Sequence, residues 1–345
     1  MRLSVLDLVP VRTDQSTGDA LAASTALARC ADRLGYTRYW VAEHHNMASV
    51  AATSPPVLIA HLAAHTSRIR VGSGGVMLPN HAPLAVAEQF ALLEAAHPGR
   101  IDLGIGRAPG SDPVTTMALR GAAGRDERDI EAFPAYLDDI VALMSPRGVR
   151  VPIPNQRYIL KATPAARSVP RLWLLGSSLY SAHLAAAKGL PYAFANHFAG
   201  DGTAEALATY RAEFRPSEHT PEPVTFLPVN AVVAATDAEA HALATPHLQA
   251  MARLRTGAPL EPLDLVDQAA DRELTAAQQA IVEAMRRRTV IGDPTRAAEQ
   301  IRQLASEFDV DEVMINPVAS AHRGTDPAAA PARTATLELL AKELF

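Results

Sequence analysis

Short apolar runs and longer amphipathic segments alternate along the 345-residue chain. The apolar runs are only a few residues long, which is typical of parallel strands buried on both faces. We predict strands at residues 3–9, 39–42, 69–72, 101–105, 172–175, 192–195, 226–235 and 312–316. The intervening segments repeat apolar residues at helical spacing, and we predict helices at about 18–34, 54–64, 83–96, 126–144, 179–188, 202–214, 237–253 and 334–344.

Glycine and proline residues mark the ends of these predicted elements. Gly35 directly follows the first helical pattern, where a glycine commonly ends a helix. Pro55 and Pro56 stand at the start of the second helix, whose first turn tolerates proline. The positions of these glycine and proline residues therefore agree with the helix boundaries that the hydrophobic pattern predicts.

The order of the elements selects one fold among the parallel α/β architectures. Strands that alternate with crossover helices form either two Rossmann-type halves or one closed barrel. Eight strands, each followed by a helix and with no linker between halves, favour the barrel. We predict one α/β domain over residues 1–345, a (β/α)8 TIM barrel with insertions.

Two insertions interrupt the alternation of strands and helices in this predicted barrel. Residues 147–170 are rich in proline and contain a short strand-like piece at 158–160. We interpret them as an excursion, an insertion that leaves the barrel and returns to it. The longest addition lies between the seventh and eighth strands. Its residues 258–290 form a lid-like insertion with a helix at about 275–288, and a second helix at about 294–307 leads into the last strand.

The composition excludes several classes of function. The net charge is −5 and aromatic residues make up only 5%, so neither nucleic acid nor an anionic membrane is a predicted partner. No apolar stretch approaches the length of a membrane span, and the N-terminal apolar run is too short for a signal peptide. The one cysteine, Cys30, excludes a disulfide framework. We therefore expect a cytoplasmic protein.

Histidines follow two of the predicted strands, at the barrel end where active sites are built. Glu43, His44 and His45 follow the second strand, and His197 follows the sixth. An imidazole there serves as an acid, a base or a proton relay, or it is a hydrogen-bonded loop histidine. His61 and His65 lack the glutamate of a metalloprotease helix, so no metal site is predicted.

Features suited to an anionic ligand follow three other strands. Glycines at 72, 74 and 75 permit close approach of a planar or anionic ligand, or they only form a tight turn. Arg107 is an anion clamp or a surface arginine. Ser177 and Ser178 open a helix, where they form a phosphate cradle, an ordinary N-cap, or both.

Several long motifs resemble one known family in the same order along the chain. Residues 40–45, 71–79, 88–107 and 176–182 are similar to the bacterial luciferase-like flavin-dependent monooxygenases, in particular to their single-polypeptide branch. The resemblance covers nearly the full length. It implies reduced FMN supplied by a separate flavin reductase, and O₂ that reacts through a C4a-peroxyflavin to oxidise a small organic substrate such as an aldehyde or another carbonyl compound.

The resemblance also assigns residues. His44 matches the catalytic histidine of the family. Ser73 and Gly74 match a bulged third strand that often holds a non-prolyl cis peptide against the flavin ring. His45 and His197 are the candidate substrate contacts because they follow the second and sixth predicted strands, and not because of the resemblance. The positions on the phosphate side of the cofactor are Arg107, Gly176, Ser177, Ser178 and Tyr180.

The chain departs from the light-emitting members of that family at two positions. Gly106 stands where the luciferase alpha subunit has a cysteine, and Gly176 stands where it has a glutamate. Two alternatives stay open: hydride transfer with the deazaflavin F420 on the same fold, and a non-catalytic luciferase-like subunit. The family also implies a homodimer formed through the second and third helices.

Overall fold

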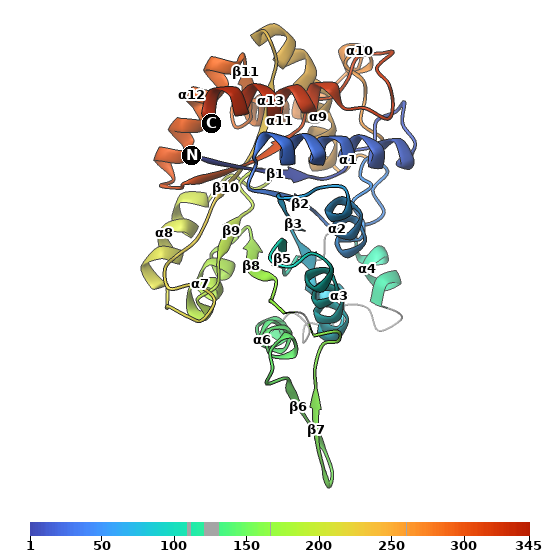
Figure 1. The fold of residues 1–345 in the computed structure, drawn as a ribbon. Helices are drawn as coiled ribbons and strands as arrows, with labels where there is room; N and C mark the ends of the chain where they lie inside the picture. Colours follow the sequence, from blue (N-terminus) through green and yellow to red (C-terminus); the bar gives the residue numbers. More distant parts are fainter. Residues whose placement is uncertain (109–111, 121–130, 166, 260) are drawn as a thin grey trace.

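A parallel sheet forms the centre of the computed structural model, which describes residues 1–108, 112–120, 131–165, 167–259 and 261–345 (Figure 1). The strands follow the order β11-β10-β12-β1-β2-β3-β5-β8-β9, with β4 beside β5. Their pairing is parallel throughout. The strands that correspond to the eight predicted ones are β1 (Arg2–Asp7), β2 (Arg38–Val41), β3 (Arg70–Ser73), β5 (Ile101–Gly106), β8 (Arg171–Gly176), β9 (Tyr192–Phe194), β10 (Leu227–Val233) and β12 (Glu312–Pro317).

Between β9 and β10 the barrel is closed by a single bridge instead of a full ladder. Tyr192 pairs with Thr225, and the Tyr192 amide donates to the Val224 carbonyl oxygen at 2.9 Å. The predicted (β/α)8 architecture is therefore present, with one loosely paired seam.

Helices cover the outside of the sheet and connect successive strands. Figure 1 shows α1, α2 and α3 following one another along one side and α7 and α8 on the other. The helices that match predicted ones are α1 (Thr17–Leu34), α2 (Pro55–Ala64), α3 (Pro83–Ala96), α6 (Phe133–Met144), α7 (Leu179–Lys188), α8 (Thr203–Glu213), α9 (Asp237–Arg255), α11 (Ala276–Arg286), α12 (Pro294–Glu307) and α13 (Pro331–Leu344).

The first helix illustrates how the local sequence sets these boundaries. The Ser16 hydroxyl accepts from the Asp19 amide, and the Asp19 carboxylate accepts from the Ser16 amide at 2.9 Å. This capping box satisfies backbone donors that the helix leaves free. At the other end Gly35 adopts a φ of 88°, as the sequence predicts for a helix-ending glycine.

Charged side chains form a buried network inside one end of the barrel. Arg38 is 2% exposed and donates to Glu312 at 2.7 Å and to Asp102 at 2.8 Å. Asp102 also accepts from Arg70 at 2.7 Å and from the Trp40 indole at 3.0 Å. Each buried charge therefore has an opposite charge and hydrogen bonds, which is the condition for tolerating it in a core.

An apolar layer lies directly above this network. One buried cluster is formed by Leu6, Trp40, Trp173 and Met314, from four different strands, and by Phe226, which directly precedes β10. The Arg38 guanidinium lies 4.8 Å from the centre of the Trp173 ring, so the two layers are in contact. This filled interior confines a ligand to the open end of the barrel.

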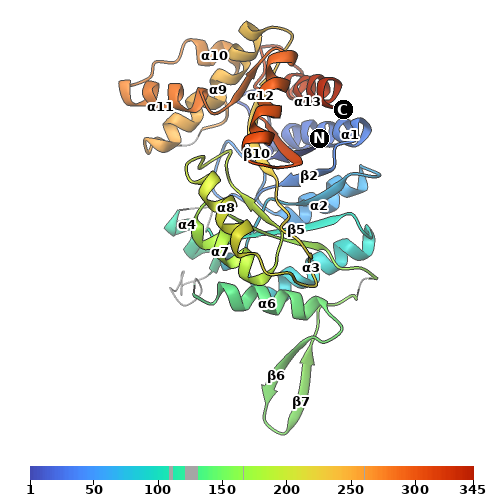
Figure 2. The same ribbon diagram turned by 90° about the vertical axis from the view of Figure 1, so that its left-hand side faces the viewer.

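The predicted excursion at 147–170 contains a β-hairpin instead of one short strand. Strands β6 (Val149–Ile153) and β7 (Gln156–Leu160) pair antiparallel and extend away from the body of the molecule (Figure 2). Ile153, Tyr158 and Ile159 on it are exposed. Strand β6 was missed because its proline and its exposed positions break the alternation that identifies a strand.

Other short elements were also not predicted. They are β4 (Val76–Met77), the 3₁₀ turn η1 (Leu78–Asn80), α4 (Pro113–Arg120), α10 (Val266–Ala270) and β11 (Val290–Gly292). Two or three residues of strand carry too little periodicity to be detected. In the described part of the chain the helix predicted at 126–144 begins at Phe133, and residues 126–130 lie outside the described residues. The lid-like insertion at 258–290 includes α10 and α11.

Within the residues that the structure describes, no helix has both the length and the apolar character needed to cross a bilayer.

Candidate active site

The candidate residues follow the carboxyl ends of four parallel strands, which meet at one end of a barrel. His44 follows β2, Arg107 follows β5, Ser177 follows β8 and His197 follows β9. The structure therefore gathers at one mouth the residues that the sequence singled out one strand at a time.

Arg107 and the first turn of α7 form the phosphate-side cluster. The Arg107 guanidinium carbon lies 4.0 Å from the centre of the Tyr180 ring, a cation–π contact that joins the end of β5 to α7. Arg107 has no carboxylate partner among the described residues. Ser178 is the N-cap residue of α7 but its side chain makes no capping hydrogen bond. The helix start therefore keeps free backbone donors next to a cation.

Gly176 is required where β8 turns into α7. A Cβ atom there would lie 2.2 Å from the Ser181 hydroxyl oxygen. Ser181 is fixed in turn, because its hydroxyl donates to the Ser178 carbonyl oxygen at 2.7 Å. The close turn explains why the glutamate of the luciferase alpha subunit has no room here.

Glycines at the end of β3 bring the backbone close to the apolar layer. The peptide bond between Gly74 and Gly75 is cis. A Cβ on Gly74 would lie 3.0 Å from Trp40, and one on Gly75 would lie 2.8 Å from the Gly104 carbonyl oxygen. The missing Cβ atoms therefore let this segment pack closely against Trp40 and the end of β5.

Ser73 lies in this segment, but its side chain is already engaged. Its hydroxyl donates to the Gly104 carbonyl oxygen and accepts from the Gly104 amide, both at 2.9 Å. The side chain is fully buried. Ser73 therefore links β3 to β5, and only its backbone is left for a ligand.

Glu43 is a buried carboxylate held by two histidines. It accepts from the imidazole Nε2 of His45 at 2.9 Å and of His81 at 2.8 Å, and from the Met77 amide at 2.9 Å. Burial alone would raise the pKa of Glu43, but these hydrogen bonds and the His81 charge lower it below its usual value. The candidate substrate contact His45 is thus fixed through Glu43.

His197 interacts electrostatically with His44 and with a third histidine, His247 of α9. Each has a buried ring nitrogen without a partner among the described residues: Nδ1 of His44, Nδ1 of His197 and Nε2 of His247. Burial, aided by the charges of His44 and His247, lowers the pKa of His197 to about 4. Burial also lowers the pKa of His247 to about 4 and that of His44 below its usual value.

Asparagines fix the backbone that carries His197. The Asn230 side chain donates to the His197 carbonyl oxygen at 2.9 Å, and Asn316 donates to Asn230 at 2.8 Å. Asn196 donates to the Pro228 carbonyl oxygen at 3.0 Å. These bonds hold β9 to β10 where the seam lacks a ladder.

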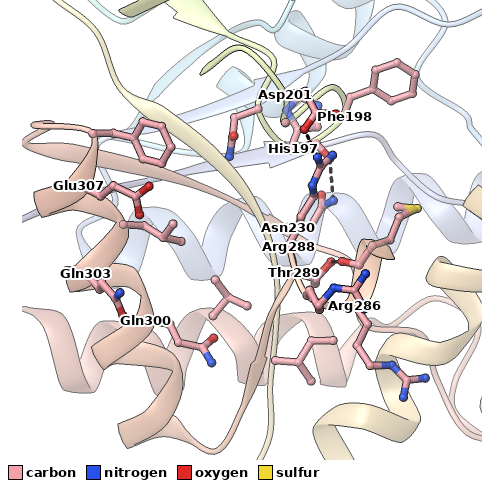
Figure 3. Close-up of a pocket in the computed structure, with 18 of the residues that line it drawn as sticks. His197, Phe198, Asp201, Asn230, Arg286, Arg288, Thr289, Gln300, Gln303 and Glu307 are labelled. Carbon is pink, nitrogen blue, oxygen red and sulfur yellow. Dashed lines mark hydrogen bonds and ion pairs between the residues drawn. The ribbon is translucent and has the colours of Figure 1, made fainter. Parts of the chain in front are cut away.

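A cavity of about 820 Å³ opens beside this mouth, with His197 and Asn230 in its wall. Figure 3 shows His197 and Phe198 across from Gln300 and Glu307 of α12. We call it the lateral groove; its boundaries are the turn after β9, the end of α11 and one face of α12. Arg107 and the start of α7 do not line it, so it is separate from the phosphate-side cluster.

Arginines line the lateral groove, but several are already paired. Arg288 pairs with Asp201 across it, as Figure 3 shows, and Arg296 pairs with Asp237 at 2.9 Å. Arg255 donates to the Phe198 carbonyl oxygen at 2.7 Å. In the part of the chain that the structure describes, no cluster of His, Cys, Asp or Glu could hold a metal ion.

His247 should make the protein less stable in acid. Its pKa is about 4 in the folded state against 6.5 in the unfolded chain, so between these values the unfolded chain binds more protons. The stability that neutral His247 provides above pH 6.5 is therefore lost as the pH falls towards 4. We expect about 2 kcal/mol of this loss between pH 7.5 and pH 5.0.

Urea unfolding of the wild type and of His247→Gln at both pH values measures the effect. The variant should lose less stability in acid than the wild type. His183→Gln is the matched control, because His183 is exposed and paired with Glu213. Equal acid sensitivity of wild type and His247→Gln contradicts the prediction.

Sequence reasoning missed Glu43, His81 and His247 as parts of the site. Glu43 adjoins His44 in a motif, so its position was a usable signal. His247 gave none, because a histidine in the middle of α9 looks like any other helical residue until the fold brings it within electrostatic reach of His197.

Known proteins resemble this chain in sequence. A family model described as luciferase-like monooxygenase matches residues 1–311. A protein named luciferase-like monooxygenase from Escherichia coli K12 is 43% identical over 317 residues, covering 91% of this chain and 90% of that protein. The N-acetyl-S-alkylcysteine monooxygenase of Bacillus subtilis is 39% identical over 203 residues, 58% of either chain.

Solved structures resemble it as well. Apo-MsnO8 matches with a TM-score of 0.83 and 35% identity, covering 99% of this chain and 98% of that one. The oxygenating constituent of 3,6-diketocamphane monooxygenase of Pseudomonas putida, solved with FMN, has a TM-score of 0.69 and 18% identity, with 100% and 98% coverage. The F420-dependent tetrahydromethanopterin reductase of Methanopyrus kandleri has a TM-score of 0.65 and 15% identity, with 99% and 98% coverage.

The last two likenesses are below 25% identity and show the fold alone. The family model and the E. coli relative confirm the resemblance seen in the sequence motifs. The chain belongs to the luciferase-like monooxygenase family and is an oxidoreductase of that kind.

Proposed function

We propose that the protein is a monooxygenase that uses reduced FMN and O₂ to oxidise a small organic substrate. The observation that carries this proposal is the Arg107–Tyr180 contact beside the uncapped start of α7, at the same barrel mouth as His44. That mouth therefore has groups that suit a cofactor phosphate, at Arg107 and α7, and a group that can transfer a proton, at His44. The family and the FMN complex of a fold neighbour agree with this choice.

The residues present fit FMN. Arg107 supplies a cation and the start of α7 supplies backbone donors from Ser177 and Ser178, which together suit a phosphate. Gly74 and Gly75 form a backbone segment without side chains, packed against Trp40 and Gly104, and this segment would lie against the flat ring. When bound, reduced FMN supplies the electrons that activate O₂.

The chain's own residues position the reactants and control protons and water. His44, neutral at pH 7 because burial lowers its pKa, moves a proton at its imidazole nitrogen. His45 and His197 contact the substrate. The insertion at 258–290 closes over the mouth as a lid and excludes water.

The proposal includes two partners of the enzyme. A separate flavin reductase in the cytoplasm supplies the reduced FMN. A second copy of the chain pairs through α2 and α3, and analytical ultracentrifugation should give the mass of two chains.

Two measurements test the function. Anaerobic titration should show that reduced FMN binds more tightly than reduced F420. With ¹⁸O₂ and a panel of aldehydes, ketones and thioethers, the labelled atom should appear in the product. Tighter binding of F420 with hydride transfer would support the deazaflavin alternative, and activity only with a partner subunit would support a non-catalytic chain.

Arg107→Ala should weaken the binding of reduced FMN. Losing one charge-assisted contact to a phosphate costs about 1.5–3 kcal/mol, or roughly 10- to 150-fold in affinity. Anaerobic fluorescence titration measures the dissociation constant. Arg150→Ala, on the β6–β7 hairpin, is the control and should bind like the wild type. An unchanged affinity for Arg107→Ala would remove Arg107 from the cofactor site.

A further inference from the structure

His197 and His247 have ring nitrogens that the fold leaves without partners. Nδ1 of His197 and Nε2 of His247 are buried and accept or donate no hydrogen bond among the described residues. An unsatisfied buried polar atom destabilises the folded protein, so two of them in side chains that interact electrostatically call for an explanation. One explanation is a ligand that supplies the missing hydrogen-bond partners.

Hydrogen bonds and packing hold His197 and His247 in place before any ligand binds. Asn230 holds the backbone of His197, and Asn316 holds Asn230, so the end of β9 does not move freely. His247 lies within α9, between the buried Pro246 and the buried Leu248. Preorganised polar groups of this kind lower the cost of binding a matching ligand.

The charge state of the pair limits what it can bind. Burial disfavours a proton on either ring, and the charges of His44 and His247 further disfavour one on His197. The pair therefore offers hydrogen bonds without a net charge. A carboxylate placed there would lose its hydration without gaining an opposite charge.

Three arginines of the neighbouring groove are already engaged by other groups. Arg288 and Arg296 already face the carboxylates of Asp201 and Asp237. Arg255 is held by the Phe198 carbonyl oxygen and lies 5.7 Å from the centre of the Phe198 ring.

We propose that His197 and His247 form the polar end of the substrate pocket and select an uncharged hydrogen-bonding group, such as a carbonyl or amide oxygen, over a carboxylate. This inference rests on the proposed function, because it assigns the substrate class of the same site. In a substrate with both kinds of group, the neutral one occupies the histidine pair.

The test compares acetamide with acetate, which have the same heavy-atom shape and differ in charge. Protein labelled with ¹⁵N-histidine, without flavin, is titrated with each probe at pH 7.5 and followed by NMR. Acetamide should shift the His197 and His247 signals in a saturable way. Acetate should leave them unchanged or bind at least about tenfold more weakly.

Variants assign the signals and check the contacts. His197→Phe and His247→Phe should each remove one signal and weaken acetamide binding about 3- to 10-fold. His183→Phe is the control and should bind acetamide like the wild type. The wild-type comparison alone remains decisive if a Phe variant fails to fold.

Two outcomes overturn the proposal: acetate binding at the pair as tightly as acetamide, or no response of either histidine to acetamide. Because this experiment contains neither flavin nor O₂, its failure is distinguishable from failure of the monooxygenase function, which the ¹⁸O₂ experiment measures separately.

Discussion

Arg38→Met should lower the free energy of unfolding by about 3–5 kcal/mol, although Arg38 touches neither the proposed cofactor site nor the histidines. Arg38 bridges Glu312 and Asp102 inside the barrel, with both carboxylates fully enclosed. Methionine fills a similar volume but leaves two carboxylates facing each other with less compensation. Breaking a buried ion network by removing one member costs more than the network itself contributes.

Arg2→Met is the matched control for this prediction. Arg2 also contacts Glu312, at 3.9 Å, but its side chain is 54% exposed. Water screens an exposed pair, so this variant should lose less than about 1 kcal/mol. Urea unfolding at pH 7.5 measures both variants, and equal losses would show that the network is not a structural element.

The same network shows what sequence reasoning can and cannot reach. Buried parallel strands appear as short apolar runs, so the barrel was predictable from the pattern. Arg38, Asp102 and Glu312 each lie within or beside such a run, and a charge there signals an interior polar contact. Which charge meets which depends on strand register, and no local pattern encodes it.

The candidate site also has residues that the sequence predicts and contacts that only the folded structure reveals. Arg107, Ser177 and His44 follow directly from the rule that barrel sites lie after strands. Ser73 follows from the same rule, but its hydroxyl bonds to Gly104, and only the pairing of β3 with β5 reveals this. His247 comes from α9, which packs on β10 and β11, and its interaction with His197 arises only in the folded structure.

His44→Gln should lower the turnover of the oxygenation reaction by about 10²- to 10⁴-fold, which is the usual contribution of a positioned proton-transfer group. Glutamine keeps a polar side chain of similar reach but does not gain or lose a proton near neutral pH. The affinity for reduced FMN should change little, because the proposed phosphate contacts come from Arg107 and α7. Stopped-flow turnover and anaerobic titration measure the two quantities separately.

The contrast between these two quantities identifies proton transfer and not folding as the cause. A merely structural histidine would affect cofactor affinity and unfolding together with turnover, and added imidazole would restore nothing. Added imidazole should partly restore turnover in a smaller variant, His44→Gly, because a free base can occupy the vacated space. His183→Gln should match the wild type in every measurement. If His44→Gln turns over within a factor of about two of the wild type, the proton at this mouth is moved by another group, and neutral His197 is the next candidate because its charge state is coupled to that of His44.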